Sequence, residues 1–158
     1  MEIRRLPQNL INQIAAGEVV ERPSSALKEL IENSLDANAT QIDIIIENGG
    51  KNLISVSDNG TGIQRDHIPL AIERHATSKL PDNHLNKIEY LGFRGEALPS
   101  IAAVSELNLQ SKYINSNQAW SLDISAGNFN EIYPSSLETG TRVSIKKLFF
   151  ATPARLKF

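Results

Sequence analysis

The sequence predicts an α+β fold in which helices cover one face of a mixed, mostly antiparallel sheet. Stretches with helical spacing alternate with short runs rich in β-branched residues, which is typical of this class. The chain has 158 residues, 41% of them hydrophobic, which suits one domain with a substantial buried core. We detect no internal repeats and no low-complexity segments. We therefore expect a single two-layer sandwich over residues 1–158.

Two helices are predicted before the first strand, because apolar residues recur at helical spacing over residues 9–16 and 24–35. Pro23 suits the first turn of the second helix, where its missing N–H costs nothing. A third, short helix is predicted over residues 96–104, although it contains Pro99.

The strand pattern begins with a hairpin. Residues 41–47 and 53–57 read as strands, and Gly49 and Gly50 lie in the turn between them. So short a connection requires an antiparallel pair. Further strands are predicted over residues 106–112, 119–125 and 141–147.

Composition excludes several classes of protein. The chain has no cysteine, so disulfide frameworks and Cys-based zinc sites are excluded, which agrees with a reducing cytosolic location. No apolar run approaches the roughly 20 residues that cross a bilayer, so we expect no membrane association. With 16 Lys and Arg against 18 Asp and Glu, the formal charge of −2 gives no overall attraction to nucleic acid.

A stripe of acidic and amide side chains is predicted along one side of the second helix, formed by Glu29, Asn33 and Asp36. Such a stripe by itself is most often a solvated face. A glutamate there can also accept a proton from a water that attacks a phosphate, and an amide oxygen one turn away can coordinate Mg²⁺. The apolar side is expected opposite, at Leu27, Leu30, Ile31 and Leu35.

A second motif, Asp58 with Gly60 and Gly62, directly follows a predicted strand. Alone, this composition is common in hairpin turns. The functional interpretation is a buried carboxylate that accepts a hydrogen bond from the exocyclic amine of adenine and rejects the carbonyl of guanine by roughly 1–3 kcal/mol. Thr141 can donate or accept near the same base.

A third motif spans residues 92–98, where glycines directly precede a predicted helix and can aim backbone N–H groups at an anion. Lys79 and Arg94 can add positive charge, although each alone is more often a surface residue. The polar segment 74–84 is either a mobile lid or an ordinary surface loop. No P-loop or Rossmann glycine pattern occurs in the sequence.

These motifs together resemble the N-terminal ATPase region of the MutL family of DNA mismatch-repair proteins, which belongs to the GHKL superfamily. The resemblance runs along the whole chain. Gyrase, the heat-shock chaperone and sensor histidine kinases share the general ATP motifs but not the segments most specific to MutL. Those segments are residues 14–23 (IAAGEVVERP), 74–79 (RHATSK), 91–98 (LGFRGEAL) and 152–155 (TPAR).

The resemblance implies the Bergerat fold, ATP and Mg²⁺ as cofactors, and roles for individual residues. Glu29 is the implied general base, Asn33 the magnesium ligand and Asp58 the adenine reader, with residues 92–98 as a phosphate-binding lid. The nucleotide-binding residues expected on this basis are Asp58, Gly60, Gly62, Thr77, Ser78, Lys79, Gly92, Phe93, Arg94, Gly95, Glu96, Ala97, Leu98 and Thr141. One departure is Asn38, which stands where the family usually has glycine and which tolerates left-handed geometry.

The resemblance also implies partners. ATPase regions of this family form a homodimer on ATP binding and act in the cytoplasm with DNA and a MutS-type mismatch-recognition protein. MutL proteins continue into a domain that supplies a lysine to the γ-phosphate and into a C-terminal dimerisation domain, so we expect this chain to be a fragment.

Two alternatives to an ATPase are open. One is a nucleotide-binding module with negligible hydrolysis. The other is a DNA-binding scaffold with a basic groove formed by Lys146, Lys147, Arg155 and Lys157, although solvated surface is the simpler reading of these charges.

Overall fold

A seven-stranded sheet forms the body of the molecule. The computed structural model describes Ile3, Pro7 and residues 23–73 and 97–148. The strand order is β1-β2-β7-β3-β4-β5, with β6 paired to β4, and each pair among the described strands is antiparallel. The strands are β1 (Ile42–Glu47), β2 (Leu53–Asp58), β3 (Glu106–Lys112), β4 (Ala119–Ser125), β5 (Asn128–Phe129), β6 (Tyr133–Ser135) and β7 (Gly140–Lys146).

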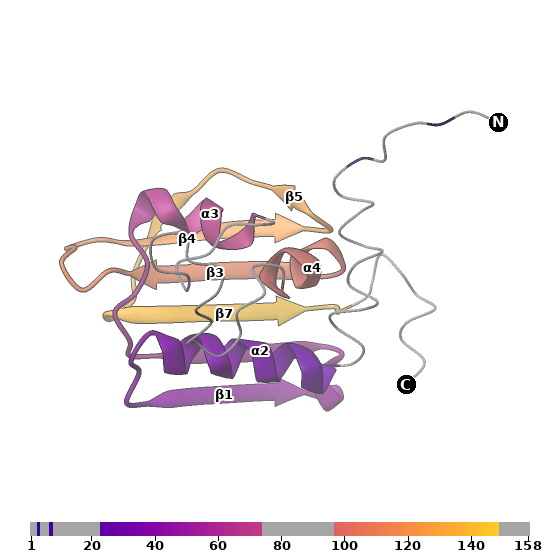
Figure 1. Cartoon of the computed structure of the whole chain (residues 1–158), viewed down its shortest axis with the longest axis horizontal. Helices are drawn as coiled ribbons and strands as arrows, with labels where there is room; N and C mark the ends of the chain where they lie inside the picture. The colour runs from indigo at the N-terminus through magenta and orange to yellow at the C-terminus, as the bar shows by residue number, and fades with distance from the viewer. Residues whose placement is uncertain (1–2, 4–6, 8–22, 74–96, 149–158) are drawn as a thin grey trace.

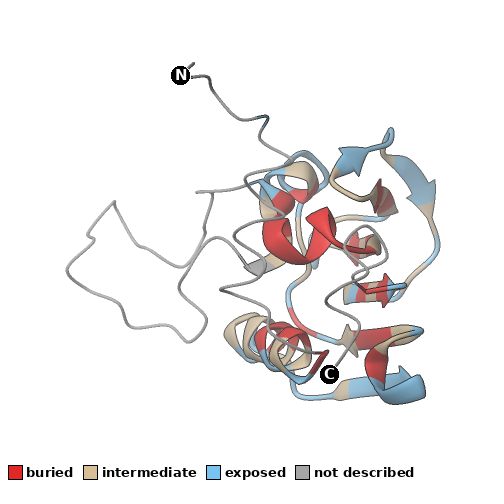
Figure 2. Cartoon of the chain, turned by 90° about the vertical axis from the view of Figure 1, so that its right-hand side faces the viewer, coloured by how far each residue is buried: buried red, intermediate tan, exposed pale blue. Residues whose placement is uncertain are grey.

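The described helices lie on one face of this sheet (Figures 1 and 2), so the predicted two-layer α+β class is confirmed. The longest, α2, packs on β2, and the short α4 packs on β3 and β4. None of the described helices is long and apolar enough to span a membrane. The helical elements are α2 (Pro23–Asp36), α3 (Ile68–Ile72) and α4 (Ala97–Ala103), with the 3₁₀ turns η1 (Asn48–Gly50) and η2 (Arg65–His67).

The core lies between the helices and the sheet (Figure 2), because alternate residues of each strand point to the helix side. On β3, Leu107 and Leu109 are buried, while Asn108 between them is half-buried. Leu109 is paired with Val143 of β7 on one side and with Leu122 of β4 on the other. Antiparallel register thus aligns apolar residues from neighbouring strands into one core.

The sequence patterns located most elements closely. The hairpin of β1 and β2 is confirmed, with Gly49 and Gly50 in its turn. The strands over 106–112 and 119–125 have the predicted bounds, β7 begins and ends one residue earlier than predicted, and the third helix is confirmed within its predicted range. Elements β5, β6 and α3 were not predicted. The predicted helix over residues 9–16 and the segment 74–84 lie outside the described residues.

The predicted faces of α2 were partly wrong. Glu29 is not on the solvated side: it is only 7% exposed and lies among the buried residues of α2 with Ala26 and Leu30. Leu35, expected on the apolar side, is 49% exposed. The cause is Ser34, which is buried because its hydroxyl has a partner on β2, so the buried side of the helix includes Ser34 instead of Leu35.

Asn38 follows α2 with a φ of 62°, which is left-handed backbone. This agrees with the expectation that asparagine tolerates left-handed geometry at this position.

Candidate functional site

The helix-facing side of the sheet becomes polar at one end. Asp58 of β2 is paired with Thr141 of β7, and Thr141 is paired with Ser111 of β3. Two residues earlier on β2, and in register on β7 and β3, the same side is apolar, with Val56, Val143 and Leu109. We call Asp58, Thr141 and Ser111 the polar row. It brings together three side chains from strands that are distant in the sequence.

The Asp58 carboxylate is held by hydrogen-bond donors. The Ser34 hydroxyl donates to Oδ2 over 2.7 Å, and the Gly60 N–H donates to Oδ1 over 2.9 Å. The Thr141 N–H also points to Oδ1, at 3.3 Å. All three groups act as donors, so the carboxylate is oriented as an acceptor at the end of β2. Its orientation depends on α2, on the loop after β2 and on β7 together.

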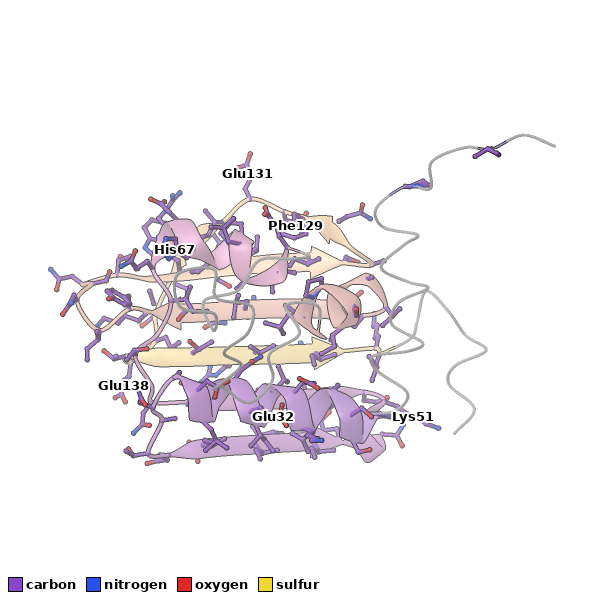
Figure 3. All side chains as sticks on the ribbon, in the orientation of Figure 1. Glu32, Lys51, His67, Phe129, Glu131 and Glu138 are labelled. Carbon is purple, nitrogen blue, oxygen red and sulfur yellow. The ribbon has the colours of Figure 1, made fainter. Side chains whose placement is uncertain are left out.

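Helix α2 carries two more predicted site residues, Glu29 in its middle and Asn33 near its end. Glu29 and Asn33 are one turn apart, which places them on the same side of the helix. Ser34, next to Asn33, ties the helix to Asp58. Figure 3 labels Glu32 on the same helix, the carboxylate directly before Asn33. The hydrogen bond from Ser34 to Asp58 therefore joins the helix that carries Glu29 and Asn33 to the strand that carries Asp58.

Glycines allow the backbone around Asp58 to pack closely. A Cβ on Gly60 would come within 2.6 Å of the Ala37 carbonyl oxygen. A Cβ on Gly62 would overlap the carbonyl oxygen of Lys112, and this residue has a φ of +74°. At Gly140 the overlap would be with the carbonyl oxygen of Asp58 itself. These contacts bring the loop after β2, the end of α2 and the start of β7 to one point.

We expect Gly140→Ala to lower the free energy of unfolding by about 2 kcal/mol more than Gly49→Ala does. Gly140 has a φ of +136° and no room for a Cβ beside Asp58, whereas Gly49 has a φ of +63° and nothing within 4 Å. Alanine can adopt the φ of Gly49 at modest cost, whereas at Gly140 both the φ of +136° and the overlap with Asp58 oppose a side chain. Urea unfolding of both variants measures the difference, and equal losses of stability would contradict the close packing at Gly140.

The other predicted site residues divide into two groups. Ala97 and Leu98 begin α4, and Leu98 packs against the core. Thr77, Ser78, Lys79, Gly92, Phe93, Arg94, Gly95 and Glu96 lie outside the described residues. Within residues 23–73 and 97–148, no cluster of three His, Asp or Glu side chains could hold a metal ion.

Sequence reasoning missed Ser34 and Ser111, both of which are buried and hydrogen-bonded. A signal for each was present. Ser34 follows Leu30 by one helical turn, and Ser111 continues the alternation of Leu107 and Leu109. A serine that occupies a core position in a periodic pattern requires a polar partner, because an unpaired buried hydroxyl is costly.

Comparison with known families agrees with this geometry. The family model described as "Histidine kinase-, DNA gyrase B-, and HSP90-like ATPase" matches residues 21–147. The chain belongs to this ATPase family. The matched range contains α2, the polar row and all seven strands of the sheet.

Within the ATPase family, the chain is similar to MutL proteins. It is 56% identical over 158 residues to the DNA mismatch repair protein MutL of Paramagnetospirillum magneticum, covering 100% of this chain and 26% of that protein. It is 52% identical to the MutL of Afipia carboxidovorans, with the same coverage. The chain thus spans about a quarter of the length of these relatives.

Solved structures give the same result. The Aquifex aeolicus MutL ATPase domain complexed with ADP matches with a TM-score of 0.70 and 33% identity, over 89% of this chain and 48% of that one. The N-terminal domain of a DNA repair protein matches with a TM-score of 0.76 and 34% identity, over 93% and 42%. The resemblance to the MutL ATPase region is confirmed.

Proposed function

We propose that the chain is the ATP-binding and ATP-hydrolysing module of a DNA mismatch-repair protein of the MutL kind. The observation that carries the proposal is the orientation of the Asp58 carboxylate by Ser34, Gly60 and Thr141. Each oxygen of an ionised carboxylate has two acceptor positions, so Oδ2 can accept a second donor beside the Ser34 hydroxyl. The exocyclic amine of adenine is such a donor, whereas guanine has a carbonyl oxygen at the same place. The site therefore favours adenine.

Glu29 suits the role of general base. It is a carboxylate that is largely removed from water, on the helix that Ser34 ties to the adenine-reading residue. From there it can take the proton of a water that attacks the γ-phosphate.

Asn33 fits a Mg²⁺ ion that arrives with the nucleotide. Magnesium takes few ligands from a protein and completes its octahedron with phosphate oxygens and water, so a single amide oxygen is a sufficient protein ligand. When bound, the ion would neutralise charge on the phosphates. Asn33 would hold it, and we assign Thr77, Ser78, Lys79 and residues 92–98 to the phosphates on the resemblance alone.

The wider role is proposed from the MutL relatives. ATP binding would order the lid and bring two ATPase regions together as a homodimer. That dimer would act in the cytoplasm with a MutS-type protein on DNA. Hydrolysis would reset it.

Calorimetric titration with a non-hydrolysable ATP analogue, with and without Mg²⁺, tests the proposal. We expect binding that is strengthened by Mg²⁺ and at least about tenfold weaker for the matching GTP analogue, because guanine leaves acceptors facing each other. Equal affinity for the two bases would contradict the role of Asp58. No binding of either nucleotide would contradict the proposed function itself.

A further inference from the structure

Ser111 is the member of the polar row on β3, and its side chain is fully buried, with 0% exposure. Its Oγ accepts a hydrogen bond from the Ile63 N–H over 2.7 Å. It donates to the Gly140 carbonyl oxygen over 3.0 Å and lies 2.8 Å from the Thr141 hydroxyl. One oxygen atom thus connects the loop after β2 with the first two residues of β7.

Either of the two hydroxyls can be the donor of the contact between them, and the number of protons limits the arrangements that satisfy every partner. A serine hydroxyl has one proton to donate and two lone pairs that accept. The Ile63 N–H can only donate, so it takes one lone pair of Ser111. In the arrangement that satisfies all three partners, the Gly140 carbonyl takes the Ser111 proton and the remaining lone pair faces Thr141. In that arrangement the Thr141 hydroxyl donates its proton to Ser111.

This direction determines what Thr141 offers to a ligand. With its proton directed to Ser111, Thr141 Oγ1 has only lone pairs available. Asp58, its paired neighbour on β2, is also an acceptor. The polar row therefore presents two acceptors side by side. In direct contact, a 6-amino group of a purine supplies two hydrogens to these acceptors, whereas a 6-carbonyl meets acceptors only.

We infer that Ser111 is a positioning residue that fixes the Thr141 hydroxyl as an acceptor and thereby sets the preference for 6-aminopurine over 6-oxopurine nucleotides. The inference rests on the proposed nucleotide site and adds a residue that does not touch the base. Without Ser111, the Thr141 hydroxyl rotates and can donate to a 6-carbonyl. Loss of Ser111 then lowers the preference for 6-aminopurine nucleotides. A loss of stability alone does not change this preference.

The test compares the affinities of Ser111→Ala for ATP and for inosine triphosphate, measured by calorimetry with Mg²⁺. Inosine triphosphate replaces the 6-amino group by a carbonyl and adds no 2-amino group. We expect the ratio of the two affinities to fall about tenfold, through weaker ATP binding and stronger inosine triphosphate binding. An unchanged ratio in the folded variant overturns the inference, as does an equal loss for both nucleotides.

Two controls separate the mechanism from disturbance of the core. Ser105 is also fully buried and donates to the Ile101 carbonyl oxygen, away from the polar row. Ser105→Ala should therefore leave the affinity ratio unchanged. In the double variant Ser111→Ala/Thr141→Val, the gain for inosine triphosphate should vanish, because no hydroxyl is left to donate. A gain that persists without the Thr141 hydroxyl overturns the inference.

Thr141 variants keep the test decisive if Ser111→Ala does not fold. Thr141→Ser retains the hydroxyl and should keep the ratio, whereas Thr141→Val should lower it, through weaker ATP binding only. Equal ratios in this pair overturn the inference. Failure of the proposed function looks different: the unmodified protein then binds neither nucleotide, whereas failure of the inference leaves ATP binding intact and the ratio insensitive to Ser111 and Thr141.

Discussion

Glu29→Gln should lower the rate of ATP hydrolysis about 1,000-fold and leave ATP affinity within about threefold. The change keeps the shape of the side chain but removes its ability to accept a proton. Glu29 is buried on α2, whereas the base-reading contacts belong to Asp58, so binding and chemistry are carried by different residues. Single-turnover hydrolysis, measured beside calorimetric binding, checks both parts.

Glu32→Gln is the matched control, because it makes the same change on the same helix at a more exposed position (Figure 3). It should leave hydrolysis within about twofold. Equal rates in Glu29→Gln and Glu32→Gln would remove Glu29 from the role of general base. If the unmodified protein binds ATP but shows no turnover, the alternative of a nucleotide-binding module with negligible hydrolysis is supported.

Asp58→Asn should weaken ATP binding at least about 100-fold. The amide keeps the size of the side chain, and its oxygen can still accept from the Gly60 and Thr141 N–H groups. Its nitrogen then occupies the place of Oδ2, where it meets the Ser34 hydroxyl and the amine of adenine. A donor in this position removes the contact that selects the base. Calorimetry measures the loss of affinity.

Asp123→Asn offers a control on the opposite face of the sheet. Asp123 is also a well-bonded carboxylate, since it accepts from Asn108 over 2.6 Å and from Tyr133 over 2.9 Å. Its loss should change thermal stability but not ATP affinity. If Asp58→Asn binds ATP as tightly as Asp123→Asn does, the carboxylate of Asp58 is not the adenine reader.

The sheet could be predicted because its strands follow simple alternation. On β3, the buried residues Leu107 and Leu109 alternate with polar neighbours, which gives both the strand and its inner face. The two short strands β5 and β6 could not be predicted this way. With two and three residues, they are too short to show a period, and their position depends on pairing with β4.

The site was predictable only in part. The candidate roles of Glu29, Asn33 and Asp58 followed from residue chemistry and from the resemblance to MutL. The supporting contacts did not, since hydrophobic spacing treats serine as a polar surface residue. Ser34 and Ser111 are buried because partners on other elements satisfy their hydroxyls. Such partners come from tertiary structure, and the same omission placed Glu29 on the wrong face of α2.

The position of β7 has a consequence for the synthesis of the protein on the ribosome. This strand is the last one described in the chain, yet it lies in the middle of the sheet, between β2 and β3. Until it leaves the exit tunnel, the inner edges of both strands lack their partner, and Asp58 and Ser111 belong to separate parts of the nascent chain. Pairing between such distant segments is slow to form. We expect the nascent chain to need protection from aggregation until Lys146 has emerged, and the proposed nucleotide site to form only once β7 pairs.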